Sequence, residues 1–212
     1  MTSVSVIRYS QPSMTHDDPS PETMERLERA EQLKLNGNYN QALGILEELL
    51  LEDPENVSAL EEVADNELSL GEYRRAEAAA RRAIALDAKS YTGHYILGFL
   101  NSRSGQWDEA AGRLRKANQL KSNNAEILRC LGWALFHAGQ RAQGIVTLER
   151  ALNLDQDSTL TLCDLGVAYI EVQNFPKSRA LLKRALELEP ENTRAQECLS
   201  AVDRFARMAR LG

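Results

Sequence analysis

The sequence predicts an all-α protein, a solenoid of antiparallel helix hairpins packed side by side. Two observations carry this prediction: an internal period of about 34 residues, and apolar residues with helical spacing inside each period. Four glycines, Gly37, Gly71, Gly105 and Gly139, recur at this one constant interval. Nothing in the repeated region alternates with the two-residue period of a strand. A chain of 212 residues, 43% of them hydrophobic, is long enough to bury such a core.

Five units follow this period without any insertion. Small side chains recur five residues after the glycine position, namely Ala42, Ala76, Ala110, Gly144 and Ser178. Two residues after it the chain carries Tyr39, Tyr73, Trp107, Arg141 and Phe175. The predicted units are residues 23–56, 57–90, 91–124, 125–158 and 159–192.

Each unit is predicted to form two helices joined at the glycine position. In the fourth unit, Leu128, Leu131 and Leu135 form one helical stripe. Gly139 can then adopt the positive φ that ends a helix. A second apolar stripe runs from Ile145 to Leu152. One hairpin has too little core to fold alone, so the copies must stack.

The two ends are expected to differ from the repeats. Residues 1–22 carry three prolines and no helical period, which predicts a flexible tail; a strand-like arm that docks on a groove is the alternative. Ser20 and Pro21 are suited to be the cap and first residue of a helix. Residues 193–212 are predicted to be a capping helix that solvates the open end of the stack. Its covering residues would be Leu199, Val202 and either Phe205 or Ala206.

The repeated unit resembles the tetratricopeptide repeat over residues 23–192. The family's small residue in the first helix appears as Ala30, Ala64, Gly98, Gly132 and Gly166, and its terminal proline as Pro54 and Pro190. The resemblance implies a right-handed superhelix that places the first helix of each repeat on a concave, protein-binding face. Glu67 and Asn101 replace a large apolar residue of the pattern. We expect both to tilt towards solvent, and a softened joint between repeats 2 and 3 is the alternative.

No residues point to catalysis, a cofactor or a metal. The histidines and cysteines lack the spacing of a metal site, and no phosphate loop or nucleophile motif occurs. We therefore expect a protein that is not an enzyme. A net charge of −6 argues against nucleic acid as a partner, and no apolar run reaches the roughly 20 residues of a membrane span. Three separated cysteines and the lack of a secretory signal favour the cytoplasm.

By the resemblance, the concave face has two contrasting halves. Repeats 1 and 2 supply an acidic half with Glu31, Glu61 and Asp65. The later repeats supply a mainly apolar groove formed by Tyr95, Phe99, Arg129, Trp133, Phe136, His137, Val167 and Ile170. Residues 23–90 hold 15 acidic and 8 basic residues, a net charge of −7, whereas residues 91–158 hold 6 and 8, a net charge of +2. Packing of Trp133 and Phe136 against the next repeat is the alternative for either residue alone.

These features predict a non-enzymatic module that binds an apolar or amphipathic peptide, as an adaptor, assembly factor or chaperone. The residues at the family's two-carboxylate clamp positions do not match in repeats 1 to 3, so heat-shock-chaperone C-terminal peptides are not expected as ligands. A self-associating scaffold, a homo-oligomer whose groove is filled by its own tail or by a neighbouring subunit, is the second hypothesis.

Overall fold

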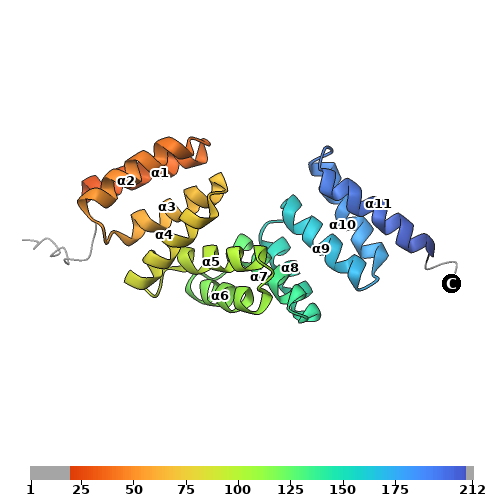
Figure 1. The fold of residues 1–212 in the computed structure, drawn as a ribbon. Coiled ribbons are helices and arrows are strands. Elements are labelled where there is room, and N and C mark those ends of the chain that lie inside the picture. Colours follow the sequence, from red (N-terminus) through yellow and green to blue (C-terminus); the bar gives the residue numbers. More distant parts are fainter. Residues whose placement is uncertain (1–19, 209–212) are drawn as a thin grey trace, which may run out of the picture.

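The computed structural model describes residues 20–208 as a curved stack of helices (Figure 1). The expectations for residues 1–19 and 209–212, most of the tail and the end of the capping helix, fall outside the described residues. The helices are α1 (Pro21–Leu35), α2 (Tyr39–Glu52), α3 (Val57–Leu70), α4 (Tyr73–Leu86), α5 (Tyr91–Arg103), α6 (Trp107–Leu120), α7 (Ala125–His137), α8 (Arg141–Leu154), α9 (Thr159–Glu171), α10 (Phe175–Leu188) and α11 (Thr193–Met208). The predicted all-α solenoid of helix hairpins is confirmed.

A polar residue caps the start of each odd-numbered helix. Ser20 accepts a hydrogen bond from the backbone N–H of Thr23, so the predicted start of α1 is confirmed. The same bond is made at the last position of every repeat, by Asn56, Ser90, Asn124, Ser158 and Asn192. Such caps satisfy amide groups that have no partner inside the helix. They recur once in every repeat and therefore fix where each hairpin begins.

The turn inside each hairpin needs a left-handed residue. Gly139 has φ 85°, and the other three glycines of the series have similar values. The fifth turn has Gln173 at this position, and it adopts φ 59°. The backbone bends alike in all five repeats, although only glycine takes this conformation without a steric cost.

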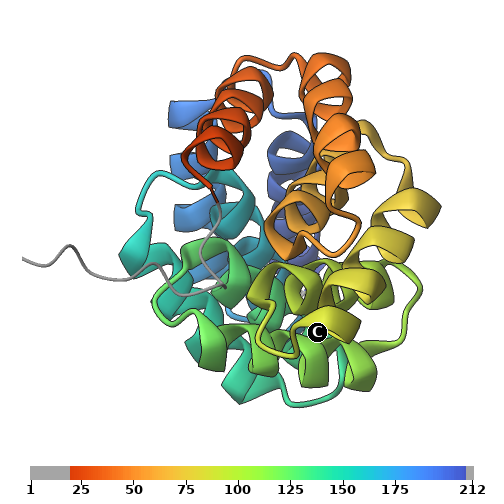
Figure 2. The ribbon, with the colours of Figure 1, turned by 90° about the vertical axis from the view of Figure 1, so that its left-hand side faces the viewer.

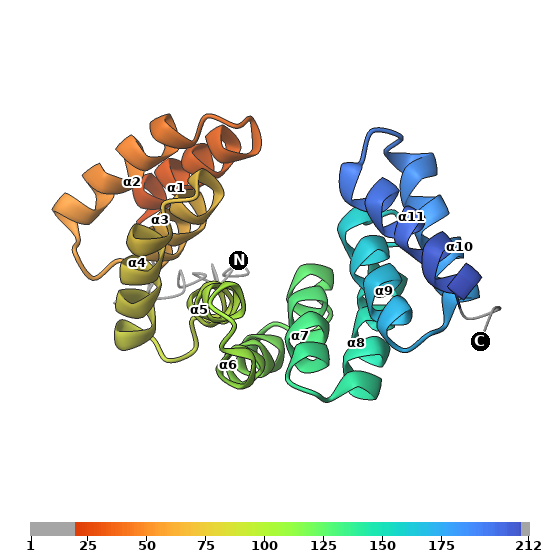
Figure 3. The same ribbon diagram turned by 45° about the vertical axis from the view of Figure 1, so that its right-hand side comes forward.

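The odd-numbered helices line the inside of the curve. Each of them contacts the next odd-numbered helix, whereas no two even-numbered helices approach each other within the described residues. The stack therefore closes on the odd side and opens on the even side. Figure 3 shows the resulting arch, in which α1–α4 form one arm, α9–α11 the other, and α5–α8 the bend. Figure 2 shows the stack from the side of α1, with the later helices behind it.

The core is a series of apolar clusters between neighbouring helices, and small residues let those helices approach closely. Gly132 of α7 and Gly144 of α8 bring these two helices very close, because a Cβ at Gly144 would lie 2.7 Å from the carbonyl oxygen of Gly132. At the far end, Val202 of α11 is buried as expected. Of the two alternatives given for the third covering residue, Phe205 is wrong, because its side chain is 46% exposed.

The expectation that Glu67 tilts to solvent is also wrong. Its side chain is only 1% exposed and lies between α3 and α4, where Oε1 pairs with Nε of Arg75 at 3.0 Å. Burial raises the pKa of Glu67, and Arg75 opposes that rise. Oε2 has no hydrogen-bond partner among the described residues. Asn101, at the equivalent site in repeat 3, is half-buried. No helix of residues 20–208 is both long and apolar enough to cross a bilayer.

Candidate functional site

Arg129 of α7 is the centre of an ion-pair network on the concave face. Its guanidinium makes two hydrogen bonds to Glu126, from Nε to Oε2 at 2.8 Å and from Nη2 to Oε1 at 2.6 Å. Nη1 reaches across to α9 and donates to Oδ2 of Asp164 at 2.8 Å. On the other side, the hydroxyl of Tyr95 in α5 donates to Oε1 of Glu126 at 3.1 Å. Three consecutive odd-numbered helices are thus joined through the pair of Glu126 and Arg129.

Asp164 extends this network to the capping helix. Its side chain is 3% exposed, and its second oxygen accepts a hydrogen bond from Nη2 of Arg194 at 2.7 Å. Both carboxylate oxygens of Asp164 are therefore occupied by arginines. The side chain of Arg194 remains 42% exposed and lies over the ring of Trp133, with Cζ 5.6 Å from the ring centre.

The pKa values follow from this burial and pairing. Burial alone would raise the pKa of Glu126, but hydrogen bonds and charge attraction from Arg129 outweigh it and hold that pKa below its usual value. Burial opposes the charge of Arg129, yet Glu126 and Asp164 raise its pKa further. Burial raises the pKa of the Cys130 thiol and that of Cys163, the latter to about 11. Both thiols are protonated at neutral pH and poorly suited to act as nucleophiles.

Aromatic side chains continue the surface beside the network. Trp133 is half-buried and meets the ring of His137 edge-on, with the ring centres 4.3 Å apart. On its other side His137 stacks on Trp107 of α6 at 4.6 Å. Next to Trp133 a hollow of about 220 Å³ opens on the concave face. Its lining residues are Phe99, Ser102, Arg103, Arg129, Cys130, Trp133, Asp164 and Arg194.

Phe136 does not belong to this surface, and its prediction as a groove residue is wrong. It is 2% exposed and packs with Leu148, Leu165, Ala168 and Tyr169 between α8 and α9. Along a helix, residues 133 and 136 are about 300° apart, so they diverge by roughly 60°. Because of this divergence, the ring of Phe136 points into the contact between repeats 4 and 5. The alternative interpretation, in which Phe136 packs against the next repeat, is therefore confirmed.

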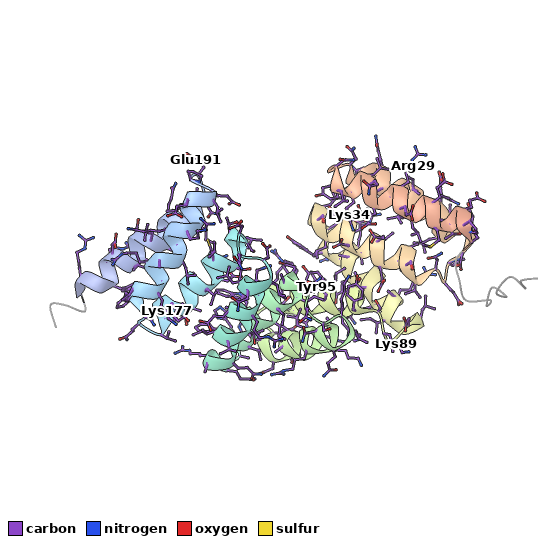
Figure 4. All side chains as sticks on the ribbon, turned by 180° about the vertical axis from the view of Figure 1, so that it is seen from behind. Arg29, Lys34, Lys89, Tyr95, Lys177 and Glu191 are labelled. Atoms are coloured by element: carbon purple, nitrogen blue, oxygen red, sulfur yellow. The ribbon has the colours of Figure 1, made fainter. Side chains whose placement is uncertain are left out.

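The other predicted groove residues are partly accessible. Tyr95 and Phe99 pack against the core formed by α6 and α7 and are half-buried. Figure 4 shows Tyr95 in the bend between the two arms. Val167 and Ile170 of α9 are also half-buried, and Ile170 contacts the core beneath α11. Trp133 belongs to none of the clusters formed by the described core residues. Its side chain is therefore available to a ligand without being part of the apolar core.

In the acidic half of the concave face, the ammonium group of Lys34 bridges two carboxylates. Lys34 of α1 donates to Oε2 of Glu62 and to Oδ2 of Asp65, both at 2.8 Å. Burial opposes the charge of Lys34, but hydrogen bonds to these two carboxylates raise its pKa. Burial raises the pKa of Glu61, although the hydroxyl of Ser90 donates to its carboxylate at 2.5 Å. Glu31 is exposed. This part of the face keeps an excess of negative charge.

Sequence reasoning missed Asp164, Arg194, Ser102 and Arg103 as parts of the site. A signal for Asp164 was present, because it is the one charged residue between Ser158 and Ile170. A lone carboxylate in an apolar helix requires a buried partner. No comparable signal marked Arg194, which lies outside the five repeats.

A second hollow of about 410 Å³ lies between α8, α9 and α10. Leu152, Leu165 and Leu181 supply most of its apolar wall, and the hydroxyl of Tyr169 at its edge donates to Glu149 at 2.6 Å. In the described part of the chain, no group of three or more histidine, cysteine, aspartate or glutamate side chains is placed to hold a metal ion.

Stacked hairpins with a concave face of polar and aromatic side chains define a helical repeat protein of the kind that presents an extended binding surface. Tetratricopeptide repeat models match residues 103–160, and residues 27–91 and 63–111, which together exceed half of the sequence. The chain belongs to the tetratricopeptide repeat family, as its sequence pattern indicated. Proteins of this family generally mediate protein–protein interactions and typically serve as non-enzymatic scaffolds.

Similar proteins come from several settings. Anaphase-promoting complex subunit 3 of Schizosaccharomyces pombe is 21% identical over 79% of this chain and 25% of that protein. BBSome complex member BBS4 of Bos taurus is 24% identical over 76% of this chain and 31% of that protein. The chain thus spans less than a third of either relative. The solved structure of YrrB, described as a TPR protein with an unusual peptide-binding site, has a TM-score of 0.60 at 19% identity, covering 81% of this chain and 89% of that one.

Proposed function

We propose that this protein is a non-enzymatic adaptor or assembly factor that holds an apolar or amphipathic segment of a partner protein on its concave face. The observation that carries the proposal is Trp133, a half-buried indole outside the core clusters, at the edge of a hollow between α5, α7, α9 and α11. Aromatic anchors beside a hollow are typical of the residues that dominate binding energy at protein interfaces. Free cysteines at 130, 163 and 198 support a reducing, cytoplasmic setting.

The arrangement of the surface supports a segment bound along the curve. Phe99 and Trp133 come from neighbouring odd-numbered helices and form walls of one hollow. Towards α1 the surface becomes acidic, with Glu31 exposed and Glu61 partly buried. A segment with an apolar centre and a basic end would match this sequence of surfaces.

Trp133→Ala tests the proposal. The protein, tagged and purified, captures partners from an extract of its own source, and mass spectrometry compares the wild type with the variant. We expect the partners held by the wild type to fall at least tenfold in the variant, because a buried aromatic anchor accounts for about 2 kcal/mol or more of binding. Helical circular dichroism and the melting temperature should stay close to wild type.

Phe205→Ala is the matched control. It also removes one exposed aromatic ring, but from the outer part of α11, 46% exposed and away from the hollow. Its captured partners should equal those of the wild type. The proposal is wrong if Trp133→Ala retains every partner, or if both variants lose the same ones.

Self-association stays a second proposal. Sedimentation velocity at several concentrations checks it, with the full chain compared with a chain that begins at Glu22. A concentration-independent monomer in both would exclude it.

A further inference from the structure

The hollow beside Trp133 has an imbalance of hydrogen-bonding groups. Both oxygens of Asp164 already accept from arginines. Glu126 accepts from Arg129 through both oxygens and from Tyr95 through one of them. Arg129 uses its Nε and both Nη atoms in these bonds. Every oxygen of these two carboxylates thus already accepts at least one hydrogen bond from the protein itself.

Two of the arginines that line the hollow keep unused N–H groups. Arg194 makes one hydrogen bond, through Nη2 to Asp164, out of the five that a guanidinium can donate. Arg103 stacks on the ring of Tyr73, 4.0 Å from its centre, and has no ion pair among the described residues. The three arginines exceed the two carboxylates of the network by one positive charge. The hydroxyl of Ser102, another lining residue, is buried and has no hydrogen-bond partner in the described chain.

We infer that this hollow binds a carboxylate of the partner segment, next to an apolar side chain that lies between Phe99 and Trp133. Spare donors beside carboxylates that are already paired favour a hydrogen-bond acceptor as ligand, and the surplus positive charge favours an anionic one. Aromatic walls on the same hollow favour an apolar neighbour of that carboxylate. The carboxylate comes from a glutamate or aspartate side chain or from a chain end. This inference rests on the proposed function. It also gives the bound segment an orientation, with its acidic end at α11 and its basic end at α1.

Three small probes separate the possible sources. N-acetyl-phenylalanyl-glutamate amide presents a side-chain carboxylate, N-acetyl-phenylalanine presents a terminal one, and N-acetyl-phenylalanyl-glutamine amide presents none. Each is titrated into the nitrogen-15-labelled full chain at low salt, and the NMR signal of the Trp133 indole N–H, identified with Trp133→Phe, gives the affinity. At least one acidic probe should bind ten times more tightly than the neutral one, and high salt should reduce that ratio.

Arginine variants connect the preference to the hollow. Arg194→Gln and Arg103→Gln should each reduce the preference for the acidic probe at least threefold. Arg103→Gln leaves Asp164 untouched, so it keeps the test valid even if Arg194→Gln unfolds the protein. Arg150→Gln, an exposed arginine of α8, is the control and should change nothing.

Equal affinities for acidic and neutral probes, a preference that survives both arginine variants, or no shift of Trp133 with any probe would each overturn the inference. The proposed function fails by a different result, which is partner capture that does not depend on Trp133. A protein that loses its partners in Trp133→Ala but shows no acid preference would keep the function and lose this inference.

Discussion

The two ends of the concave face use ion pairs in opposite ways. Where α1 meets α3, one lysine, Lys34, serves two carboxylates. Where α9 meets α7 and α11, one carboxylate, Asp164, lies between two arginines. The first end keeps spare acceptors and the second keeps spare donors. The same structural task, joining neighbouring first helices of repeats, thus leaves two chemically distinct surfaces for a ligand.

Burial also differs between these ends. The Asp65 side chain is 35% exposed and that of Asp164 is 3% exposed. A charge removed from water is costly unless it is paired, so the loss of a partner matters far more at the second end. Substitutions can therefore separate the residues that hold the fold from those available to a partner.

The largest expected effect separates two aromatic residues of α7. Phe136→Ala should lower the free energy of unfolding by about 3–5 kcal/mol, because it leaves a cavity in the joint between repeats 4 and 5. Trp133→Ala should cost about 1 kcal/mol, since much of that ring already faces the hollow. Urea denaturation followed by circular dichroism measures both. Similar losses for the two variants would show that Trp133 is a core residue.

The second comparison replaces one carboxylate at each end. Asp164→Asn removes the negative charge that pairs with both Arg129 and Arg194, and it should destabilise the protein by about 3 kcal/mol. Asp65→Asn leaves Glu62 to pair with Lys34 at a more exposed site and should cost less than about 1 kcal/mol. Chemical denaturation at neutral pH is the measurement. Equal costs would mean that the two ends of the concave face are not different in kind.

A smaller effect of opposite sign is expected at Glu67. This buried carboxylate has one oxygen without a partner in the described chain, and its other oxygen pairs with an arginine whose side chain is 61% exposed. Glu67→Leu should stabilise the protein by about 1 kcal/mol, because an apolar residue of similar volume removes the cost of burying the charge. A rise in melting temperature would support this. A fall would show that the pair with Arg75 is worth more than the burial costs.

The smallest effect concerns pH. Arg129 holds the pKa of Glu126 below its usual value of 4.5, so Glu126 stabilises the folded state above that pH and loses this contribution as the pH falls through its lowered pKa. Glu126→Gln should therefore flatten the decline of stability between about pH 5 and pH 3. Urea titrations at a series of pH values measure the slope. An unchanged slope would mean that Glu126 gains nothing from Arg129 on folding.

Much of the fold could be predicted from the sequence, because a fixed repeat period constrains every hairpin at once. The turn at Gln173 shows the strength of that constraint, since the backbone takes the left-handed form even without glycine. Phe136 was misplaced because periodicity gives its angle around the helix but not how closely the next hairpin packs. Glu67 was misplaced because its burial depends on a partner, Arg75, on another helix.

The ion-pair network was harder to predict for the same reason. Arg129 was recognised as a concave residue, but Asp164 meets it only after repeats 4 and 5 have stacked, and Arg194 meets Asp164 only after the capping helix has packed on repeat 5. Contacts between repeats join residues that are a whole hairpin apart in sequence, and no local pattern links them. The acidic half was simpler, because an excess of charge can be counted without knowing which residues pair.

Site-specific photo-crosslinking tests the central claim most directly. A photoreactive phenylalanine analogue replaces either Trp133, beside the hollow, or Val146, which is 55% exposed on α8. In cells that make the protein, the substituent at position 133 should form covalent adducts with a partner and the one at position 146 should form few. Adducts at position 146 with none at position 133 would contradict a partner held on the concave face.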